Sequence, residues 1–530
     1  MMQFINYYIQ MLRRFVSKKE IDKKVDKEQK QKINFLHLKA FVSQFSDKEV
    51  NISDDTWNDL NMDDVFCHID KTITTCGEQV LYKMLKNPLF SEEGLKERGY
   101  YISYFQNHIE KRKKIQDILN KLGRINKDVT SVLCNKLKPN LKLKLLVSIL
   151  PLLFFINIFM LSFIKSKVCI YSLIVLGLTN ICVHYNMGYL IMEQIAVIQY
   201  IGRIINISNK LYVVLKDVSP EYAIKLKNLY DKCKIIGKRT SILSRIEGMD
   251  VFADYLNIIF LIKERNYFTI ASYIEKFKDE IIQMYMLVGK LDALISIALY
   301  RDSIDQFVEP EFVNENKVLD VEGIFHPLLE KPVKNSLKVK NNGIIITGSN
   351  MSGKSTFMRT IGVNAIFAQT IYTCLANKYR TSFYNIVSSV SLNDDLIKGK
   401  SYYLCEAEAI YKVLNICEKS SCCLALIDEI FNGTNPTERI GAAVEILNYL
   451  AEKNTLTIVS THDLQLIQML KGYEAYYFKE TVTKEGLKFD YHIRKGISQS
   501  RNAVKILEYL GYPYDLITRI NKRVKIIETA

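Results

Sequence analysis

The chain has 530 residues, 48% of them hydrophobic, which makes it too long for one compact domain and apolar enough for several cores. It carries 72 Lys and Arg against 57 Asp and Glu, and the net charge of +15 favours anionic partners such as nucleic acid, anionic lipid or nucleotide, unless the lysines are simply solvated. Its 11 cysteines form no C-x-x-C pair, which excludes a zinc site and a disulfide framework and indicates buried thiols in a reducing compartment.

Residues 1–52 are predicted to form an N-terminal helical and charged segment. The apolar residues at its start are interleaved with polar ones, and Arg13 and Arg14 follow them rather than precede them, which is not the order of a signal peptide. We expect an amphipathic helix here, packed on the protein or lying on a membrane. The mixed-charge run 18–32 is predicted to be solvated helix or linker.

Two separate segments are predicted to be helical. In residues 53–140, Leu81, Met84 and Leu85 recur at helical spacing until Asn87-Pro88 interrupts the pattern. In residues 193–315, spaced Ile, Leu and Tyr alternate with charged residues, and Gly and Pro are sparse, as in long helices. The two segments would be the first and second parts of one all-α core, interrupted between them.

The interruption, residues 141–192, is the largest shift in composition along the chain. Residues 145–164 contain no charged side chain, and 20 residues at about 1.5 Å each give roughly 30 Å, the thickness of the hydrocarbon part of a bilayer. After Lys165-Ser166-Lys167, a second mostly apolar run covers 168–192. We predict a transmembrane helical hairpin that contacts lipid over both runs and leaves both flanking regions on one side; the alternative is a buried helical pair in a soluble bundle.

Residues 316–530 are predicted to be an α/β domain. From Lys317 onward, short apolar runs alternate with helical patterns. Three of these runs, at Gly343–Ile346, Cys423–Ile427 and Thr455–Val459, are predicted to be strands of a mostly parallel sheet.

The first of these strands leads into TGSNMSGKST, which satisfies the phosphate-loop pattern G-x-x-x-x-G-K-[ST] in full. Its glycines let backbone N–H groups turn toward one phosphate chain, Lys354 would neutralise the β- and γ-phosphate oxygens, and the Ser355 hydroxyl would ligate Mg²⁺. The alternative is a chance Gly-rich turn, and the two elements described next weigh against it. The ATP-binding residues predicted from this loop are Gly348, Ser349, Asn350, Met351, Ser352, Gly353, Lys354, Ser355 and Thr356.

The other two predicted strands end in residues that suit hydrolysis of a nucleotide. The second strand is followed by Asp428, predicted to hold Mg²⁺, and by Glu429, predicted to polarise the attacking water. The third is followed by His462, predicted to contact the γ-phosphate or that water, although a lone His is usually structural. ATP would be the substrate and Mg²⁺ the cofactor, and the predicted catalytic residues are Glu429, His462 and Lys354.

These motifs resemble those of the MutS family. TGSNMSGKSTFMR is similar to the family's TGPNMGGKSTYMR, with Ser349 and Ser352 in place of a proline and a glycine. STHD at 460–463 resembles the family's TTHD, and His326-Pro327 resembles its HP turn, which adds His326 to the implied ATP-binding residues. SYYLCE, which begins at Ser401, resembles the family's STFMVE, and this implies that Ser401 contacts the nucleotide of the partner subunit.

The resemblance extends over roughly 53–140 and 193–530. DDVFCHIDKTITTCGEQVLYKMLKNPL resembles the start of the family's helical core and lever, and LVGKLDALISIA, at 287–298, resembles the return of the lever to the ATPase domain. It implies an α/β C-terminal ABC-type P-loop ATPase domain plus an all-α core and lever, here interrupted by the transmembrane hairpin. It also implies a homodimer through the ATPase domains, with composite ATP sites.

Several departures set the chain apart from the repair proteins of that family. The first fifty residues hold no Phe-x-Glu wedge, DEIFNGT at 428–434 stands where repair members have DELGRGT, and Arg501-Asn502 replaces Tyr-Gly. Mismatch recognition is therefore not expected, whereas duplex DNA remains an open partner that the charge permits and no base-reading motif supports.

Together these patterns predict a multi-pass membrane protein with two membrane helices and a cytoplasmic catalytic domain. It would bind and hydrolyse ATP as a MutS-like dimer with DNA-binding capacity. The alternative is an ATP-driven switch for a membrane process with no role for DNA.

Overall fold

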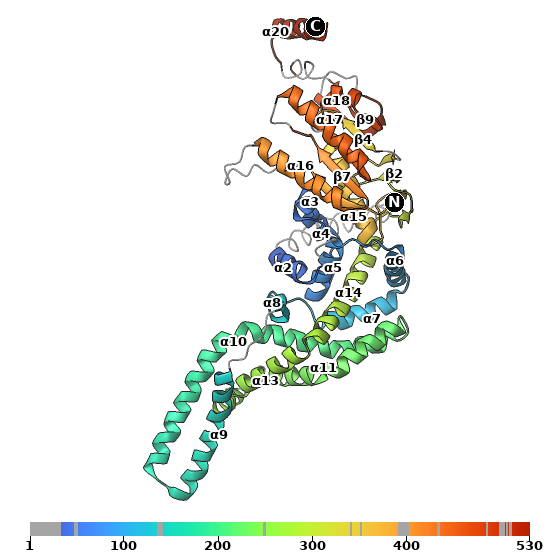
Figure 1. The fold of residues 1–530 in the computed structure, drawn as a ribbon. Coiled ribbons are helices and arrows are strands. Elements are labelled where there is room, and N and C mark those ends of the chain that lie inside the picture. The colour runs from blue at the N-terminus through green and yellow to red at the C-terminus, as the bar shows by residue number, and fades with distance from the viewer. Residues whose placement is uncertain are drawn as a thin grey trace, which may run out of the picture.

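The computed structural model describes most of the chain as an elongated molecule, with an α/β region at one end and a protruding helical hairpin at the other (Figure 1). The described residues are 33–46, 51–134, 141–246, 251–339, 342–349, 352–390, 402–431, 435–483, 486–497, 504, 507 and 511–529. Residues 1–32 and 47–50 of the predicted segment 1–52 and the predicted site residues Asn350, Met351 and Ser401 lie outside them, as does Arg501-Asn502.

The first part of the described chain is helical, as the sequence predicts. Ser53, Thr74 and Ser91 each cap the N-terminus of a helix by accepting a hydrogen bond from a backbone N–H in its first turn. The helices are α2 (Phe35–Phe45), α3 (Asp54–Asp59), α4 (Met62–Ile69), α5 (Thr75–Lys86), α6 (Glu92–Asn107), α7 (Ile109–Asn120), α8 (Val129–Cys134), α9 (Leu141–Ile164), α10 (Lys167–Leu215), α11 (Pro220–Ile246), α12 (Val251–Phe260), α13 (Ile262–Lys276) and α14 (Lys278–Ser303).

One buried carboxylate joins the two helical parts. Asp292 of α14 accepts hydrogen bonds at Oδ2 from the backbone N–H groups of Ile73 and Thr74, at 3.1 and 2.8 Å, and from the Thr74 hydroxyl at 2.6 Å. Gly77 permits this approach, because a Cβ at that position would lie 2.1 Å from the Asp292 carboxylate. The segment Asp70–Gly77, at the start of α5, is therefore a connection between α5 and α14.

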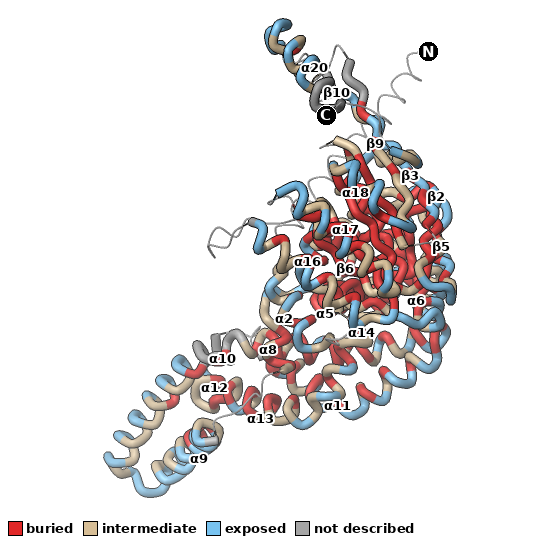
Figure 2. Tube along the Cα trace, turned by 45° about the horizontal axis from the view of Figure 1, so that its top comes forward, coloured by how far each residue is buried: buried red, intermediate tan, exposed pale blue. Residues whose placement is uncertain are grey.

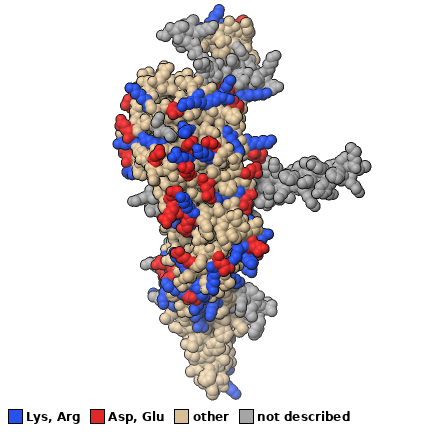
Figure 3. Space-filling model, turned by 90° about the vertical axis from the view of Figure 1, so that its right-hand side faces the viewer, with Lys and Arg blue, Asp and Glu red and all other residues tan. Residues whose placement is uncertain are grey.

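The apolar hairpin, Lys142–Ile164 of α9 and Lys167–Met187 of α10, projects from the helical region with little cover (Figure 2). Among the described residues, three helices are long and apolar enough to cross a membrane by length and composition. In the 18-residue apolar stretch of each hairpin span only 17% and 6% of the residues are buried, against 72% in that of α14. In Figure 3 the tapering end of the molecule shows almost no charged side chain. Helix α14 is thus a core helix, whereas the side chains of the hairpin face outward.

The hairpin does not end where the composition changes. Helix α10 continues without a break from Lys167 to Leu215, so the composition boundary predicted at residue 192 is no boundary between elements. Its second half packs against α11 and α14 in the helical body. Inside the hairpin, the Asn157 amide donates a hydrogen bond to Ser172, which links α9 to α10.

In the part of the chain that the structure describes, the α/β region contains two sheets. The larger has the strand order β10-β9-β4-β8-β7-β6, parallel except for β10, and the smaller has the order β1-β5-β2-β3. The strands are β1 (Glu311–Phe312), β2 (Leu319–Ile324), β3 (Asn335–Val339), β4 (Gly343–Thr347), β5 (Lys378–Thr381), β6 (Asn385–Ser389), β7 (Cys423–Asp428), β8 (Thr455–Ser460), β9 (Tyr473–Thr483) and β10 (Gly486–Lys495), and the helices are α15 (Lys354–Thr370), α16 (Tyr402–Lys419), α17 (Pro436–Glu452), α18 (Leu464–Met469) and α20 (Tyr514–Thr529).

The three predicted strands are confirmed as β4, β7 and β8, and they are neighbours in one parallel sheet. Strand β8 lies between β4 and β7, and all three strands are buried along almost their whole length. Because the carboxyl ends of parallel strands meet at one edge, the residues that follow β4, β7 and β8 come together there.

Candidate functional site

The loop after β4 is built around glycines at positions where side chains do not fit. Gly348 has φ 146°, and a Cβ there would lie 2.8 Å from the Ser352 hydroxyl. Gly353 has φ 104° in the left-handed region and precedes α15 directly, so α15 begins at the end of the loop. A loop of this form at a helix N-terminus directs N–H groups toward an anion.

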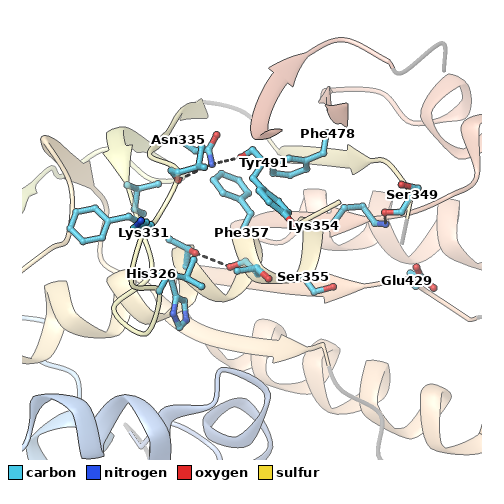
Figure 4. A pocket seen from close by; sticks show the side chains of 17 residues that line it. His326, Lys331, Asn335, Ser349, Lys354, Ser355, Phe357, Glu429, Phe478 and Tyr491 are labelled. Carbon is cyan, nitrogen blue, oxygen red and sulfur yellow. Dashed lines mark hydrogen bonds between the residues drawn. The ribbon is translucent and has the colours of Figure 1, made fainter. Parts of the chain in front are cut away.

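Lys354 is buried at this helix start, and its side chain turns back over the loop (Figure 4). Its Nζ donates hydrogen bonds to the carbonyl oxygens of Gly348 and Ser349, at 2.8 and 3.1 Å. Burial lowers the pKa of Lys354, although the carboxylates of Glu429, Asp428 and Glu480 act in the opposite direction. The ammonium group is therefore held by weak acceptors that a stronger anion can replace.

Two carboxylates follow β7 at the same sheet edge. Asp428 accepts a hydrogen bond from the Ser460 hydroxyl at the end of β8. Glu429 lies in the left-handed region with φ 53°, and its backbone N–H donates to Ser460 O at 3.2 Å. This turn directs consecutive side chains differently, so that Glu429 lines the cavity described below and Asp428 contacts β8.

His462 connects the carboxylate to the lysine. Its Nε2 lies 2.8 Å from Glu429 Oε1 and 3.4 Å from Lys354 Nζ. Because a carboxylate only accepts hydrogen bonds, we assign the ring proton to Nε2, which donates to Glu429. The approach of Lys354 Nζ to the same nitrogen is then a close contact and not a hydrogen bond, because both groups are donors. All three predicted catalytic residues therefore lie within one chain of contacts.

A cavity of about 480 Å³ lies beside the phosphate loop, within the size range of ligand pockets. Six of the predicted ATP-binding residues line it, together with Glu429 and the aromatic residues Phe357, Phe478 and Tyr491. The six are His326, Ser349, Gly353, Lys354, Ser355 and Thr356.

Tyr491 is a residue of this cavity that the sequence did not reveal. It has φ 56° at a register shift between Phe489 and Ile493, where β10 bulges away from β9. Asn335 fixes the bulge, donating to Tyr491 O at 3.0 Å and accepting from Ile493 N at 2.8 Å. The Tyr491 ring thus lies against the loop, 3.2 Å from where a Cβ on Gly353 would be.

His326 borders the same cavity, but its ring is directed away from Lys354 in Figure 4. Its Nδ1 accepts a hydrogen bond from Leu328 N at 3.3 Å, and its buried Nε2 has no partner. Burial lowers the pKa of His326 to about 4, with a further contribution from the cation of Arg359. The imidazole is therefore neutral at pH 7 and contributes to this site mainly through its backbone turn.

The residues at the loop also suit Mg²⁺. No group of three or more His, Cys, Asp or Glu in the described part of the chain could hold a metal ion. A hydroxyl from Ser355 and a carboxylate from Asp428 are oxygen donors that leave most positions of Mg²⁺ for phosphate oxygens and water, which is how this ion is usually bound with nucleotides.

Comparison with known proteins identifies this region. Residues 344–528 match the model of MutS domain V. The chain is 25% identical over 511 residues to DNA mismatch repair protein MutS of Fusobacterium nucleatum, covering 87% of this chain and 57% of that protein. It is 29% identical over 324 residues to MutS of Petrotoga mobilis, covering 59% and 39%, and 30% identical over 274 residues to human MutS protein homolog 4, covering 47% and 28%.

The chain thus spans between 28% and 57% of the length of these relatives. The matches support a place in the MutS family, and residues 344–528 correspond to its domain V, the ATPase domain.

Proposed function

We propose that this chain binds and hydrolyses ATP in the cavity beside the phosphate loop, as a MutS-like homodimer anchored in a membrane by the apolar hairpin, with capacity to bind duplex DNA. The observation that carries the enzymatic part is the chain of contacts from Lys354 through His462 to Glu429 at one edge of the sheet. These groups supply a cation for the phosphates and a carboxylate for water within a few ångströms of each other.

Each residue has a role in this reaction that follows from its position. Lys354 exchanges its two carbonyl acceptors for phosphate oxygens when ATP enters. Glu429 orients the attacking water and takes up its proton, while the 2.8 Å bond from His462 fixes the carboxylate. Mg²⁺, when bound through Ser355 and Asp428, neutralises charge on the β- and γ-phosphates.

The base of the nucleotide is proposed to stack on Tyr491. Replacing Tyr491 with alanine is expected to weaken ATP binding roughly 5- to 150-fold, because stacking of a base on an aromatic ring contributes about 1–3 kcal/mol. Tyr491→Phe keeps the ring and should bind ATP like the unchanged protein. Tripolyphosphate, which has no base, should bind Tyr491→Ala and the unchanged protein equally in calorimetric titration; equal weakening for both ligands would show that Tyr491 supports only the loop.

Membrane anchoring is supported by the outward-facing apolar side chains of the hairpin. Leu152, Phe159 and Phe163 of α9 and Val168 and Val175 of α10 are all exposed, without a partner element in the described chain to cover them. A surface of this extent is unfavourable in water and favourable in hydrocarbon. With both flanks on one side of the bilayer, the α/β region is proposed to be cytoplasmic.

The dimer rests on the resemblance of SYYLCE to the segment that reaches the partner's nucleotide in the family. In this chain the segment begins at Ser401 and leads into α16, whose described part starts at Tyr402. Ser401 is proposed to meet the γ-phosphate bound by the other protomer.

A second candidate function is an ATP-driven switch for a membrane process without DNA. The continuity of α10 from the hairpin into the helical body favours it, since that helix connects the hairpin to α14 and hence to the α/β region.

ATP turnover by the purified full chain, with and without fully paired duplex DNA at low salt, separates these functions. Stimulation by DNA that disappears as salt rises supports the first. Turnover indifferent to DNA but altered by reconstitution into lipid supports the second. Absence of ATP turnover under all these conditions contradicts both functions. Membrane anchoring is tested separately, by whether the hairpin resists carbonate extraction.

A further inference from the structure

A second cavity, of about 290 Å³, lies on the hairpin rather than at the nucleotide site. It is lined by Phe154 of α9, by Gly177 and Asn180 of α10, and by Tyr255 and Ile259 of α12. Helix α12 packs against both hairpin helices here, and the rings of Phe155 and Phe260 lie 4.9 Å apart. The cavity therefore belongs to a three-helix unit on the apolar part of the molecule.

Asn180 is one of the residues that line this cavity, and only half of its side-chain amide forms a hydrogen bond. Its Nδ2 donates to Ile259 O at 2.9 Å, a carbonyl in the last turn of α12. Because this bond fixes which end of the amide is nitrogen, the other end is an acceptor. That oxygen, Oδ1, is buried and has no hydrogen-bond partner. A buried carbonyl oxygen in apolar surroundings is unfavourable unless a donor reaches it.

The remaining features define the chemistry of a ligand that would supply this donor. No charged side chain lines the cavity, and apart from the Tyr185 and Tyr255 hydroxyls its other walls are aliphatic and aromatic, so the ligand is neutral and mostly apolar. Tyr185 and Tyr255 line it and are themselves exposed, as tyrosines are where apolar and polar zones of a bilayer meet.

We propose that this cavity binds one neutral acyl lipid with a free hydroxyl group, of the diacylglycerol type, which rests on the membrane anchoring proposed above. The lipid hydroxyl donates to Asn180 Oδ1, and an acyl chain lies along Gly177 and Phe154. Phosphatidylcholine has no hydrogen-bond donor for the Asn180 oxygen and does not replace this ligand.

Gly177 provides the means to fill the cavity without disturbing the helices. A Cβ at Gly177 would meet only Phe154 Cε2, at 3.9 Å, which is ordinary contact. Alanine therefore fits with the cavity left open, whereas the larger side chain of Gly177→Leu would occupy the space of the acyl chain.

The test uses the full chain in phosphatidylcholine nanodiscs that contain either a photoreactive diacylglycerol or the same lipid with its hydroxyl acetylated. We expect the hydroxyl lipid to label the unchanged protein roughly tenfold more than the acetylated one, since one hydrogen bond to a buried acceptor is at stake. Gly177→Ala should be labelled like the unchanged protein and Gly177→Leu roughly tenfold less. Equal labelling by both lipids, or labelling of Gly177→Leu at the unchanged level, would overturn the assignment.

Carbonate extraction of the same proteins from membranes keeps two failures apart. A chain that stays in the membrane but shows no preference for the hydroxyl lipid contradicts the lipid site alone. A chain released by carbonate contradicts the anchoring and the lipid site together. Because the comparison of the two lipids uses the unchanged protein, it remains decisive even if Gly177→Leu does not fold.

Discussion

Replacing Glu429 with glutamine is expected to lower ATP turnover by about 10²- to 10⁴-fold while ATP still binds. Glutamine has nearly the same shape but cannot take up a proton from the attacking water. Its amide can still contact His462 Nε2, which lies 2.8 Å from the present carboxylate, so the surrounding geometry should persist. Steady-state phosphate release measures the turnover, and nucleotide titration measures the binding.

A matched exchange elsewhere controls for the loss of a carboxylate as such. Glu474 lies on β9, pairs with Lys495 at 2.6 Å and is not among the residues that line the nucleotide cavity, so Glu474→Gln should leave turnover nearly unchanged. Unaltered turnover in Glu429→Gln would remove Glu429 from the role of general base. Loss of binding along with turnover would assign it instead to positioning of the loop.

Replacing Arg301 with methionine is expected to destabilise the protein by about 2–6 kcal/mol, because each of two buried acceptors left without its donor costs about 1–3 kcal/mol. Arg301 lies in the last turn of α14 and is almost wholly buried. Its guanidinium donates to Tyr372 O at 2.6 Å, Thr373 Oγ1 at 2.9 Å and Glu309 Oε1 at 3.1 Å. Methionine keeps the length of the side chain and leaves these acceptors unpaired, so α14 would lose its main polar attachment to the segment after α15.

Denaturant titration of the full chain in detergent measures this loss. The control is Arg380→Met, because Arg380 pairs at 3.2 Å with the exposed Glu311, and removal of such surface pairs changes stability by about 1 kcal/mol or less. A similar small effect for Arg301→Met would mean that apolar packing, and not this guanidinium, holds α14 to the α/β region.

The parts that sequence predicts well are those whose chemistry is local. The phosphate loop is a contiguous pattern, and β4, β7 and β8 are contiguous apolar runs with charged or hydroxyl residues after them. Their meeting at one sheet edge follows from parallel pairing alone. Two uncharged runs likewise predict the hairpin helices, and both runs are helical.

The parts that sequence does not predict depend on contacts between distant residues. Tyr491 reaches the cavity because Asn335, more than 150 positions earlier, stabilises a bulge that no local pattern marks. The end of α10 at Leu215 could not be located from composition. The side chains of this helix change from apolar to mixed where it leaves the hairpin, but its backbone stays helical. The contact of Ser349 with Glu480 likewise joins a loop residue to a strand far along the chain.

With the membrane anchoring proposed above, the lysines at the tip of the hairpin have a consequence for how the protein is made. Lys165 and Lys167 would have to cross the bilayer before the hairpin is in place, and each lysine at mid-membrane costs about 2.5–3.5 kcal/mol. The fifteen Leu, Ile, Val and Phe residues of 145–164 contribute roughly −0.3 to −0.6 kcal/mol each, which about balances two such lysines. The second apolar run supplies the surplus, so the two helices are expected to enter the membrane together, only after both have left the ribosome.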